Sequence, residues 1–239
     1  MTTAFTRNQI RLRSLYRVML RSWTRLTVRR LERVRVERVD GVELLMLPGV
    51  FDGVRLRTGA ILARALDSLP LDGRTRVLDL GAGSGIAAVF AARRGAQVIA
   101  TDINPESARC ARINALLHGL EARIETRVGD LFAPIGDERF DLVLFNPPYF
   151  RGQPRDMAER AWRSPDVFDR FLRELPAHLN ERGRALVVLS SDNEVEEALH
   201  AAKYLQINVF KRQDLINEVV TVYEVTVGAQ HAVPLRPER

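Results

Sequence analysis

Residues 76–85 read RVLDLGAGSG, a short apolar stretch followed by three alternating glycines. The apolar part, Arg76–Leu80, predicts a buried strand. Gly81, Gly83 and Gly85 then permit a tight turn and a close approach of a ligand to the backbone at the carboxyl edge of a sheet. The spacing is not that of dinucleotide binders, and no Gly-Lys-Ser/Thr follows, so neither a pyrophosphate cradle nor a P-loop is indicated. The stretch therefore predicts the first strand and first turn of a doubly wound α/β domain.

The chain beyond this stretch alternates between strand and helix patterns, which predicts parallel strands joined by right-handed crossovers. The last two predicted strands follow each other without room for a helix, so we expect them to pair antiparallel at one edge. We expect helices over about 84–94, 105–118, 166–179 and 193–202, and strands over 76–80, 97–101, 122–128, 140–145, 185–190, 205–211 and 218–227.

The residues before this core divide into two parts. Apolar positions spaced three and four apart predict a basic amphipathic helix from about residue 8 to 30. Alternating apolar residues around Asp40-Gly41 predict a β-hairpin, and Thr58–Leu69 predicts a lead-in helix. We therefore expect an arm over 1–32, a hairpin and lead-in helix over 33–73, the main domain over 74–229, and a frayed tail over 230–239.

Composition and charge narrow the class of protein. Hydrophobic residues make up 46% of the 239 residues and charged residues 28%, which is typical of a folded globular chain. The one cysteine, Cys110, excludes an intramolecular disulfide, and four scattered histidines give no zinc-ligand spacing, so no metal is expected. Residues 1–38 carry +9, whereas the other 201 residues carry −3. This asymmetry favours contact of the arm with RNA, a ribosome or an anionic surface, although a solvated helix face in an arginine-rich chain explains it equally well.

Acidic residues follow the next two predicted strands. Asp102 ends the second strand, 23 residues after Asp79, and is placed to accept from a ribose diol. Asp102 could instead cap the next helix, but Asn104 is better placed for that role because it directly precedes Pro105. Asp130 ends the third strand and can accept from an exocyclic adenine amine. The pattern predicts an adenosine pocket without phosphate contacts.

The fourth strand ends at Asn146-Pro147-Pro148-Tyr149. Consecutive prolines remove two backbone N–H donors, so this turn presents acceptors: the Asn146 side-chain oxygen and the Pro147 carbonyl. Two acceptors beside the ring of Tyr149 suit a planar NH₂ group, whose lone pair they would direct toward an electrophile. A rigid strand-ending turn is the simpler alternative for the tetrapeptide alone.

These motifs resemble those of class I S-adenosylmethionine-dependent methyltransferases with an Asn-Pro-Pro-Tyr signature. From Val77 to about Val227 the chain is most similar to HemK-like glutamine methyltransferases of translation release factors, in particular their small single-domain form. The resemblance implies a Rossmann-like, seven-stranded, mostly parallel sheet with the last strand antiparallel. It also implies S-adenosyl-L-methionine as cofactor, with catalytic residues Asn146, Pro147 and Tyr149. The residues expected to bind the cofactor are Thr58, Asp79, Gly81, Ala82, Gly83, Gly85, Asp102, Ile103, Asp130, Leu131 and Asn146.

Two departures from this family concern the acceptor. Arg57-Thr58-Gly59 keeps the family's threonine but lacks the acid before it, and Ala161–Pro165 replaces a glycine-rich stretch. We therefore expect an N-methyltransferase whose first candidate acceptor is a glutamine amide of a protein such as a release factor. N-methylation of adenine or guanine in RNA or DNA is the main alternative, followed by a small-molecule amine and a non-catalytic RNA-binding module.

The expected location is cytoplasmic, or mitochondrial if the acid-free residues 1–31 are a transit peptide. No apolar run in the sequence is long enough for a transmembrane helix. The oligomeric state is left open.

Overall fold

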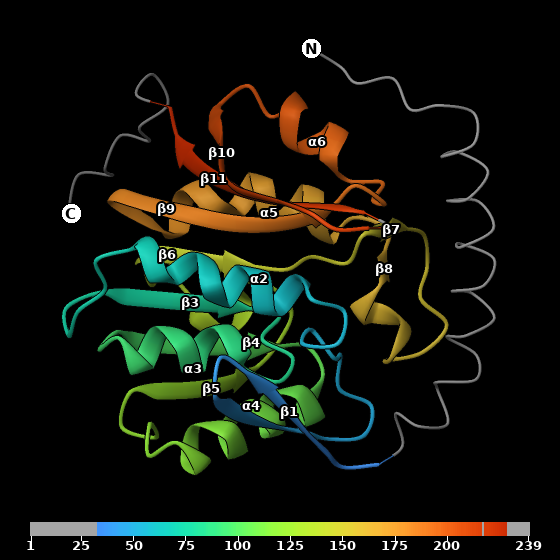
Figure 1. Cartoon of the computed structure of the whole chain (residues 1–239). Coiled ribbons are helices and arrows are strands. Elements are labelled where there is room, and N and C mark those ends of the chain that lie inside the picture. The colour runs from blue at the N-terminus through green and yellow to red at the C-terminus, as the bar shows by residue number, and fades with distance from the viewer. Residues whose placement is uncertain (1–32, 217, 229–239) are drawn as a thin grey trace.

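The computed structural model describes residues 33–216 and 218–228, and within them a seven-stranded sheet forms the centre (Figure 1). Its strand order is β10-β11-β9-β6-β3-β4-β5. Strands β3 to β6 and β9 are parallel, and β11 runs antiparallel to both of its neighbours. The seven strands are β3 (Arg76–Leu80), β4 (Gln97–Asp102), β5 (Ile124–Val128), β6 (Phe140–Phe145), β9 (Leu179–Ser190), β10 (Leu205–Asp214) and β11 (Val219–Val227). The expected fold class is confirmed.

Helices cover both faces of the sheet, each over its own apolar cluster. On one face, α2 (Thr58–Ala65) and α3 (Ile86–Arg93) pack on alternate residues of the central strands, such as Val77 and Leu144. The neighbouring α4 (Pro105–Leu117) contacts α3, β4 and β5. On the other face, α5 (Val167–Glu174) and α6 (Glu196–Ala201) pack on residues that point the opposite way. Burial on both faces is typical of parallel strands and explains their continuous apolar runs.

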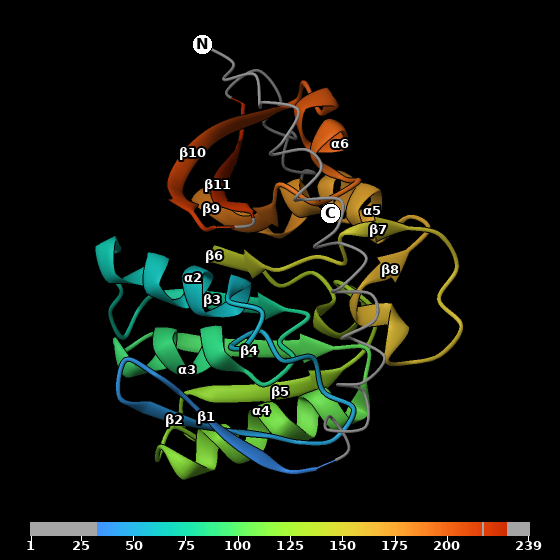
Figure 2. The same cartoon turned by 45° about the vertical axis from the view of Figure 1, so that its right-hand side comes forward.

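The predicted β-hairpin is present outside the main sheet. It consists of β1 (Arg35–Val39) and β2 (Val42–Met46), and its turn residues Asp40 and Gly41 both have positive φ, 49° and 80°. Figure 2 shows the hairpin lying along α4. Asn114 of α4 fixes it there, because its amide accepts from the Leu45 N–H (2.7 Å) and donates to the Leu45 carbonyl (2.8 Å). The hairpin thus delivers residues 47–57 to the carboxyl end of the sheet.

The structure differs from the sequence-based expectation in three places. The helix expected to reach residue 179 ends at Glu174 and continues as the 3₁₀ turn Leu175–His178, because Pro176 lacks the N–H that an α-helix needs there. Strand β9 consequently begins at Leu179 rather than 185. Two short parallel strands, β7 (Phe150–Arg151) and β8 (Arg163–Ser164), were not expected.

Short 3₁₀ turns complete the structure at Leu66–Ser68, Ala133–Ile135 and Glu159–Ala161. The predicted basic helix and tail lie outside the described residues. Within residues 33–216 and 218–228, no helix is long and apolar enough to cross a membrane.

Candidate functional site

A cleft lies at the carboxyl end of β3, β4, β5 and β6, and the glycine turn forms its floor. Gly81, Gly83 and Gly85 have φ of 67°, 56° and 76°, a conformation that favours glycine. Gly81 and Gly83 line the cleft. Gly85 instead begins α3, and a Cβ there would lie 2.7 Å from the Cβ of Ala111 in α4. The first two glycines therefore open backbone to a ligand, and the third allows two helices to pack closely.

Asp102 is held in the cleft by the backbone on both sides. One carboxylate oxygen accepts from the Gly83 N–H (2.9 Å) and the other from the Asn104 N–H (2.8 Å). Burial raises the pKa of Asp102 above its ordinary value, partly offset by these bonds. The Ser107 hydroxyl is a further hydrogen-bond partner of this carboxylate, and the remaining accepting capacity of its two oxygens is open to a ligand in the cleft that Asp102 lines. Asn104, not Asp102, caps α4, because its side chain accepts from the Glu106 N–H at 3.0 Å.

The third strand end is closed by an ion pair. Asp130 lines the cleft and forms two hydrogen bonds with the guanidinium of Arg170 in α5, at 2.9 and 3.2 Å. Arg170 also lines the cleft. Leu131, which follows Asp130 in the sequence, has φ of 47°. Nothing in the sequence indicates this partner for Asp130, because the two residues lie 40 positions apart on different elements.

Asn146 lies at the fourth strand end and is bound on both sides of its amide. Its Nδ2 donates to Thr58 Oγ1 (3.1 Å), and its Oδ1 accepts from the Tyr149 hydroxyl (3.1 Å). The same hydroxyl lies 3.3 Å from the Val188 carbonyl. Burial raises the pKa of Tyr149 well above its ordinary value, so this hydroxyl stays neutral.

Seven of the expected site residues line the cleft, and the others lie behind it. The lining residues are Gly81, Gly83, Asp102, Ile103, Asp130, Leu131 and Asn146. The residues that are not part of the lining are Thr58, Asp79, Ala82, Gly85, Pro147 and Tyr149.

Asp79 is the most buried titratable group among these residues. It accepts from the Ala88 N–H of α3 at 2.9 Å. Burial, with a smaller contribution from the nearby Asp102, raises the pKa of Asp79 to about 7. Its contact anchors α3 to β3 and does not reach the cleft.

The outer wall of the cleft is a loop that the sequence did not predict, residues 150–166, here called the outer loop. Strands β7 and β8 close its base (Figure 1). Arg151 forms ion-paired hydrogen bonds with Asp169 of α5. Its tip lines the cleft with residues that include Gln153, Met157 and Arg160. Trp162 meets Phe51 edge to face at 4.7 Å, which joins the outer loop to residues 47–57.

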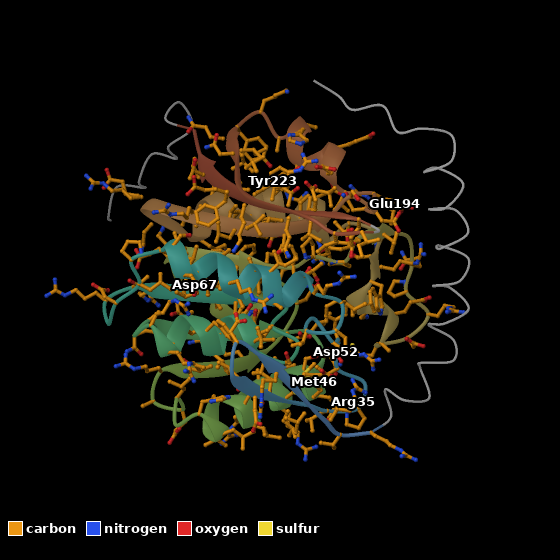
Figure 3. The ribbon with its side chains drawn as sticks, in the orientation of Figure 1. Arg35, Met46, Asp52, Asp67, Glu194 and Tyr223 are labelled. Atoms are coloured by element: carbon orange, nitrogen blue, oxygen red, sulfur yellow. The ribbon has the colours of Figure 1, made fainter. Side chains whose placement is uncertain are left out.

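The segment 47–57 is tied to the hairpin by a second ion pair. Arg35 of β1 binds the buried carboxylate of Asp52 at 3.1 Å (Figure 3). This pair lies beside Phe51 and Gly49, two further residues of the cleft wall. This part of the cleft wall is therefore built from segments far apart in the sequence.

The cleft suits the adenosyl group of S-adenosylmethionine. Asp102 offers acceptors for a diol, while Ile103, Leu131 and Phe145 provide apolar walls. A Cβ on Gly81 would make ordinary contact with the Phe145 ring at 3.8 Å, so the φ of 67°, and not a lack of space, favours glycine at this position. Among the described residues, no cluster of three metal-ligating side chains was found.

Comparisons with known proteins show which family this chain resembles. The methyltransferase small domain family matches residues 41–216. A ribosomal protein uL3 glutamine methyltransferase from Bradyrhizobium diazoefficiens is 38% identical over 138 residues, which are 52% of this chain and 43% of that protein. A ribosomal RNA small subunit methyltransferase C from Alcanivorax borkumensis is 34% identical over 142 residues, 59% of this chain and 40% of that protein. The chain thus spans less than half the length of these two relatives.

One solved structure shows the same fold. A 16S rRNA methyltransferase from T. thermophilus, in complex with AdoMet and guanosine, superposes with a TM-score of 0.62 at 22% identity over 80% of this chain and 50% of that one. The family match covers most of the chain and confirms the class of enzyme and the cofactor expected from the motifs. The chain belongs to the methyltransferase small domain family.

Proposed function

We propose that this protein is an N-methyltransferase that transfers the methyl group of S-adenosylmethionine to a planar NH₂ group. We further propose that the acceptor is the side-chain amide of a glutamine in a protein of the translation apparatus, such as a release factor. The observation that carries the proposal is the position of Asn146. It lines the same cleft as Asp102 and Gly81, at the end of the neighbouring strand β6.

Donor binding is assigned to the first three strand ends. The carboxylate of Asp102 would accept from the ribose hydroxyls, and Asp130 would accept from the adenine amine while it stays paired with Arg170. The sulfonium of the donor supplies an activated methyl group. The protein's task is therefore to orient the acceptor and exclude water, and no strong base is required.

Acceptor orientation is assigned to the fourth strand end. The free lone pair of Asn146 Oδ1 would accept one hydrogen of the acceptor NH₂ group. We assign the other hydrogen to the Pro147 carbonyl, which directly follows Asn146 in the chain although Pro147 is not among the residues that line the cleft. These contacts would draw the nitrogen lone pair out of conjugation, and they strengthen as the nitrogen rehybridises. Among the described residues that line this cleft there is no histidine or cysteine, consistent with a reaction that needs no strong base and no covalent intermediate. The N–CH₃ bond would form as the S–CH₃ bond breaks, the thioether product would leave with the bonding electrons on sulfur, and the surplus proton of the nitrogen would pass to water.

The relative that methylates a glutamine of uL3 supports the amide as acceptor. A second candidate, an exocyclic amine of RNA, is supported by the rRNA methyltransferase relative and by charge. Arg160 lines the cleft without an ion pair to any described residue, and residues 1–38 carry +9. Phosphate groups would complement these guanidinium groups.

Fractionation of labelled product tests the choice of acceptor. The protein is incubated with a labelled methyl donor and a cell extract, and protein, RNA and small molecules are then separated. We expect the label in protein, on glutamine. Label in RNA would support the second candidate, and absence of label from every fraction would contradict methyl transfer itself. The Asn146→Ala variant serves as the control for background incorporation.

Deletion of residues 1–31 tests the contact of the arm with a large anionic acceptor. We expect the truncated protein to fold, because the strands and the glycine turn begin later, and to lose turnover on RNA-containing particles more than on a short peptide. Equal loss on both acceptors would contradict an electrostatic role for the arm. Circular dichroism of the truncated protein checks that the fold is intact.

A further inference from the structure

Thr58 is fixed behind the cleft by the start of α2. The residue before it, Arg57, has φ of 67°, and Gly59 donates its N–H to the Gly53 carbonyl at 3.0 Å. A Cβ on Gly59 would lie 3.1 Å from the Gly53 backbone, so the two segments are packed tightly. Thr58 itself is 4% exposed and does not line the cleft. Its position is therefore set by backbone contacts and not by a ligand.

Three side chains form a ring of polar contacts at this point, and the one proton of the Tyr149 hydroxyl is shared between Asn146 Oδ1 and the Val188 carbonyl, at 3.1 and 3.3 Å. Asn146 Nδ2 donates to Thr58 Oγ1 at 3.1 Å, and the Tyr149 hydroxyl donates to Asn146 Oδ1 at 3.1 Å. The Thr58 hydroxyl, which can donate and accept at once, is also a hydrogen-bond partner of Tyr149. The ring joins the start of α2 to the end of β6, across 88 positions of sequence.

The ring uses half of the hydrogen-bonding capacity of the Asn146 amide. A carboxamide has two N–H donors and two oxygen lone pairs. Thr58 takes one donor and Tyr149 takes one lone pair, which leaves one of each for the cleft that Asn146 lines. A half-turn of the amide would exchange its oxygen and nitrogen, and an N–H would then face the N–H groups of an acceptor.

We propose that Thr58 and Tyr149 are positioning residues for methyl transfer, which hold the Asn146 amide with its free oxygen lone pair toward the acceptor nitrogen. The inference rests on the proposed function and adds two residues that act through Asn146 without contact with the donor. Thr58, expected from the sequence among the cofactor-binding residues, acts on the acceptor side instead. The aromatic ring of Tyr149 matters less here than its hydroxyl.

Kinetics of single-hydroxyl variants test the positioning role. Thr58→Val and Tyr149→Phe should each lower kcat by about tenfold, the equivalent of one lost hydrogen bond in the transition state. Calorimetry should show unchanged donor affinity, and Thr58→Ser should keep most of the activity. In the Asn146→Ala background, Thr58→Val should cause no further loss, because the group that it positions is gone.

Two matched controls remove a hydroxyl elsewhere. Thr75→Val removes hydrogen bonds with Asp72 before β3, at the opposite end of the sheet. Tyr223→Phe removes the hydrogen bond between Tyr223 of β11, labelled in Figure 3, and Glu196 of α6. Both controls should lower the melting temperature without changing kcat. A kcat of Thr58→Val within twofold of wild type, or a loss that persists unchanged in the Asn146→Ala background, would overturn the proposal.

Nuclear magnetic resonance provides a readout that needs no methyl transfer. The ¹⁵N side-chain amide signal of Asn146, assigned by its absence in Asn146→Ala, should exchange slowly with water in wild type and Thr58→Ser, and faster in Thr58→Val. Equal exchange in all three proteins would overturn the ring. Absence of transfer by the wild type would overturn the proposed function instead, so the two failures are distinguished.

Discussion

The proposed donor side and the proposed acceptor side of the cleft are built in different ways. On the donor side, backbone groups hold the key carboxylate: Asp102 accepts from the N–H groups of Gly83 and Asn104, with the Ser107 hydroxyl as a further partner. On the acceptor side, side chains from distant segments hold one another, as Thr58 holds Asn146 and Phe51 meets Trp162. The Thr58–Asn146 and Phe51–Trp162 contacts span 88 and 111 positions of the sequence.

This difference has a functional consequence. Backbone contacts persist when side chains are substituted, so the framework of the donor site should stay intact in its variants. We therefore expect these variants to change the affinity for the donor. Side-chain contacts change with each substitution, so variants of the acceptor side should change turnover and the choice of acceptor. Variants at four positions test this comparison.

The largest effect is expected at Asn146. Asn146→Ala should lower kcat by about 10²–10³, or about 2.7–4 kcal/mol, because a preorganised contact with the reacting group is lost. Donor affinity should remain nearly intact, since this residue lies at the fourth strand end. Steady-state kinetics at saturating donor and acceptor measures the loss. Retention of more than about a third of wild-type turnover would contradict alignment by Asn146, and lost donor affinity would indicate a structural turn.

The next effect is expected at Asp102. Asp102→Ala should weaken the donor by about 1.5–3 kcal/mol, because a charged acceptor for two hydroxyls is removed. Turnover at saturating donor should be largely kept. Isothermal calorimetry measures the affinity, with Asp67→Ala as the control, since Asp67 pairs with Arg94 and does not line the cleft (Figure 3). Unchanged affinity would exclude the ribose contact.

A pH effect on stability is expected from Asp79. Its pKa in the fold is about 7, above the ordinary 3.8, so the folded protein binds this proton more tightly than the unfolded chain. Protonated Asp79 therefore adds its full contribution to the free energy of unfolding when the pH is below the unfolded pKa. This contribution is lost as the pH rises to about 7, at up to about 1.4 kcal/mol per pH unit. Asp102, whose pKa is also raised, acts in the same direction.

Urea unfolding between pH 5 and 7.5 measures this dependence. Carboxyl groups with a lowered pKa, such as Asp40 and Glu138, change the stability only at pH values below this range. Wild-type stability should fall as the pH rises, and the fall should be smaller in Asp79→Asn, which keeps an acceptor for Ala88. Identical slopes in both proteins would show that Asp79 is ionised in the fold.

The smallest effect is expected at Arg170. Its pair with Asp130 is partly exposed, 28% and 41% of the two side chains, and such pairs contribute about 0.2–1 kcal/mol. Arg170→Ala should therefore weaken the donor by less than about fivefold. Arg173→Ala, on the exposed side of the same helix, is the control. A loss beyond tenfold would show that Arg170 contacts the donor directly.

The same contrast explains how much could be predicted from the sequence. Three donor-side positions are marked by the local sequence: Gly81 directly follows β3, Asp102 ends β4 and Asp130 lies two residues after β5. Parallel strands bring their carboxyl ends together. The parallel sheet and its antiparallel edge follow from the same pattern. The hairpin was predictable because Asp40-Gly41 encodes its own turn.

The remaining features depend on the tertiary structure. The sequence contains Thr58 and Asn146 but no signal that they meet, and the same holds for Asp130 and Arg170. The outer loop lacks hydrophobic periodicity, since β7 and β8 have two residues each. Asp79 was expected at the ligand because it borders the glycine turn, whereas its side chain points to the start of α3.

The most direct test of the account identifies the atom that receives the methyl group. The wild-type protein is incubated with a deuterium-labelled methyl donor and a cell extract, and the product is sequenced by tandem mass spectrometry. The account predicts the label on the nitrogen of a glutamine side-chain amide, and its absence when Asn146→Ala is used. A methyl group on carbon, oxygen or sulfur, or equal product from both proteins, would contradict nitrogen methylation through Asn146.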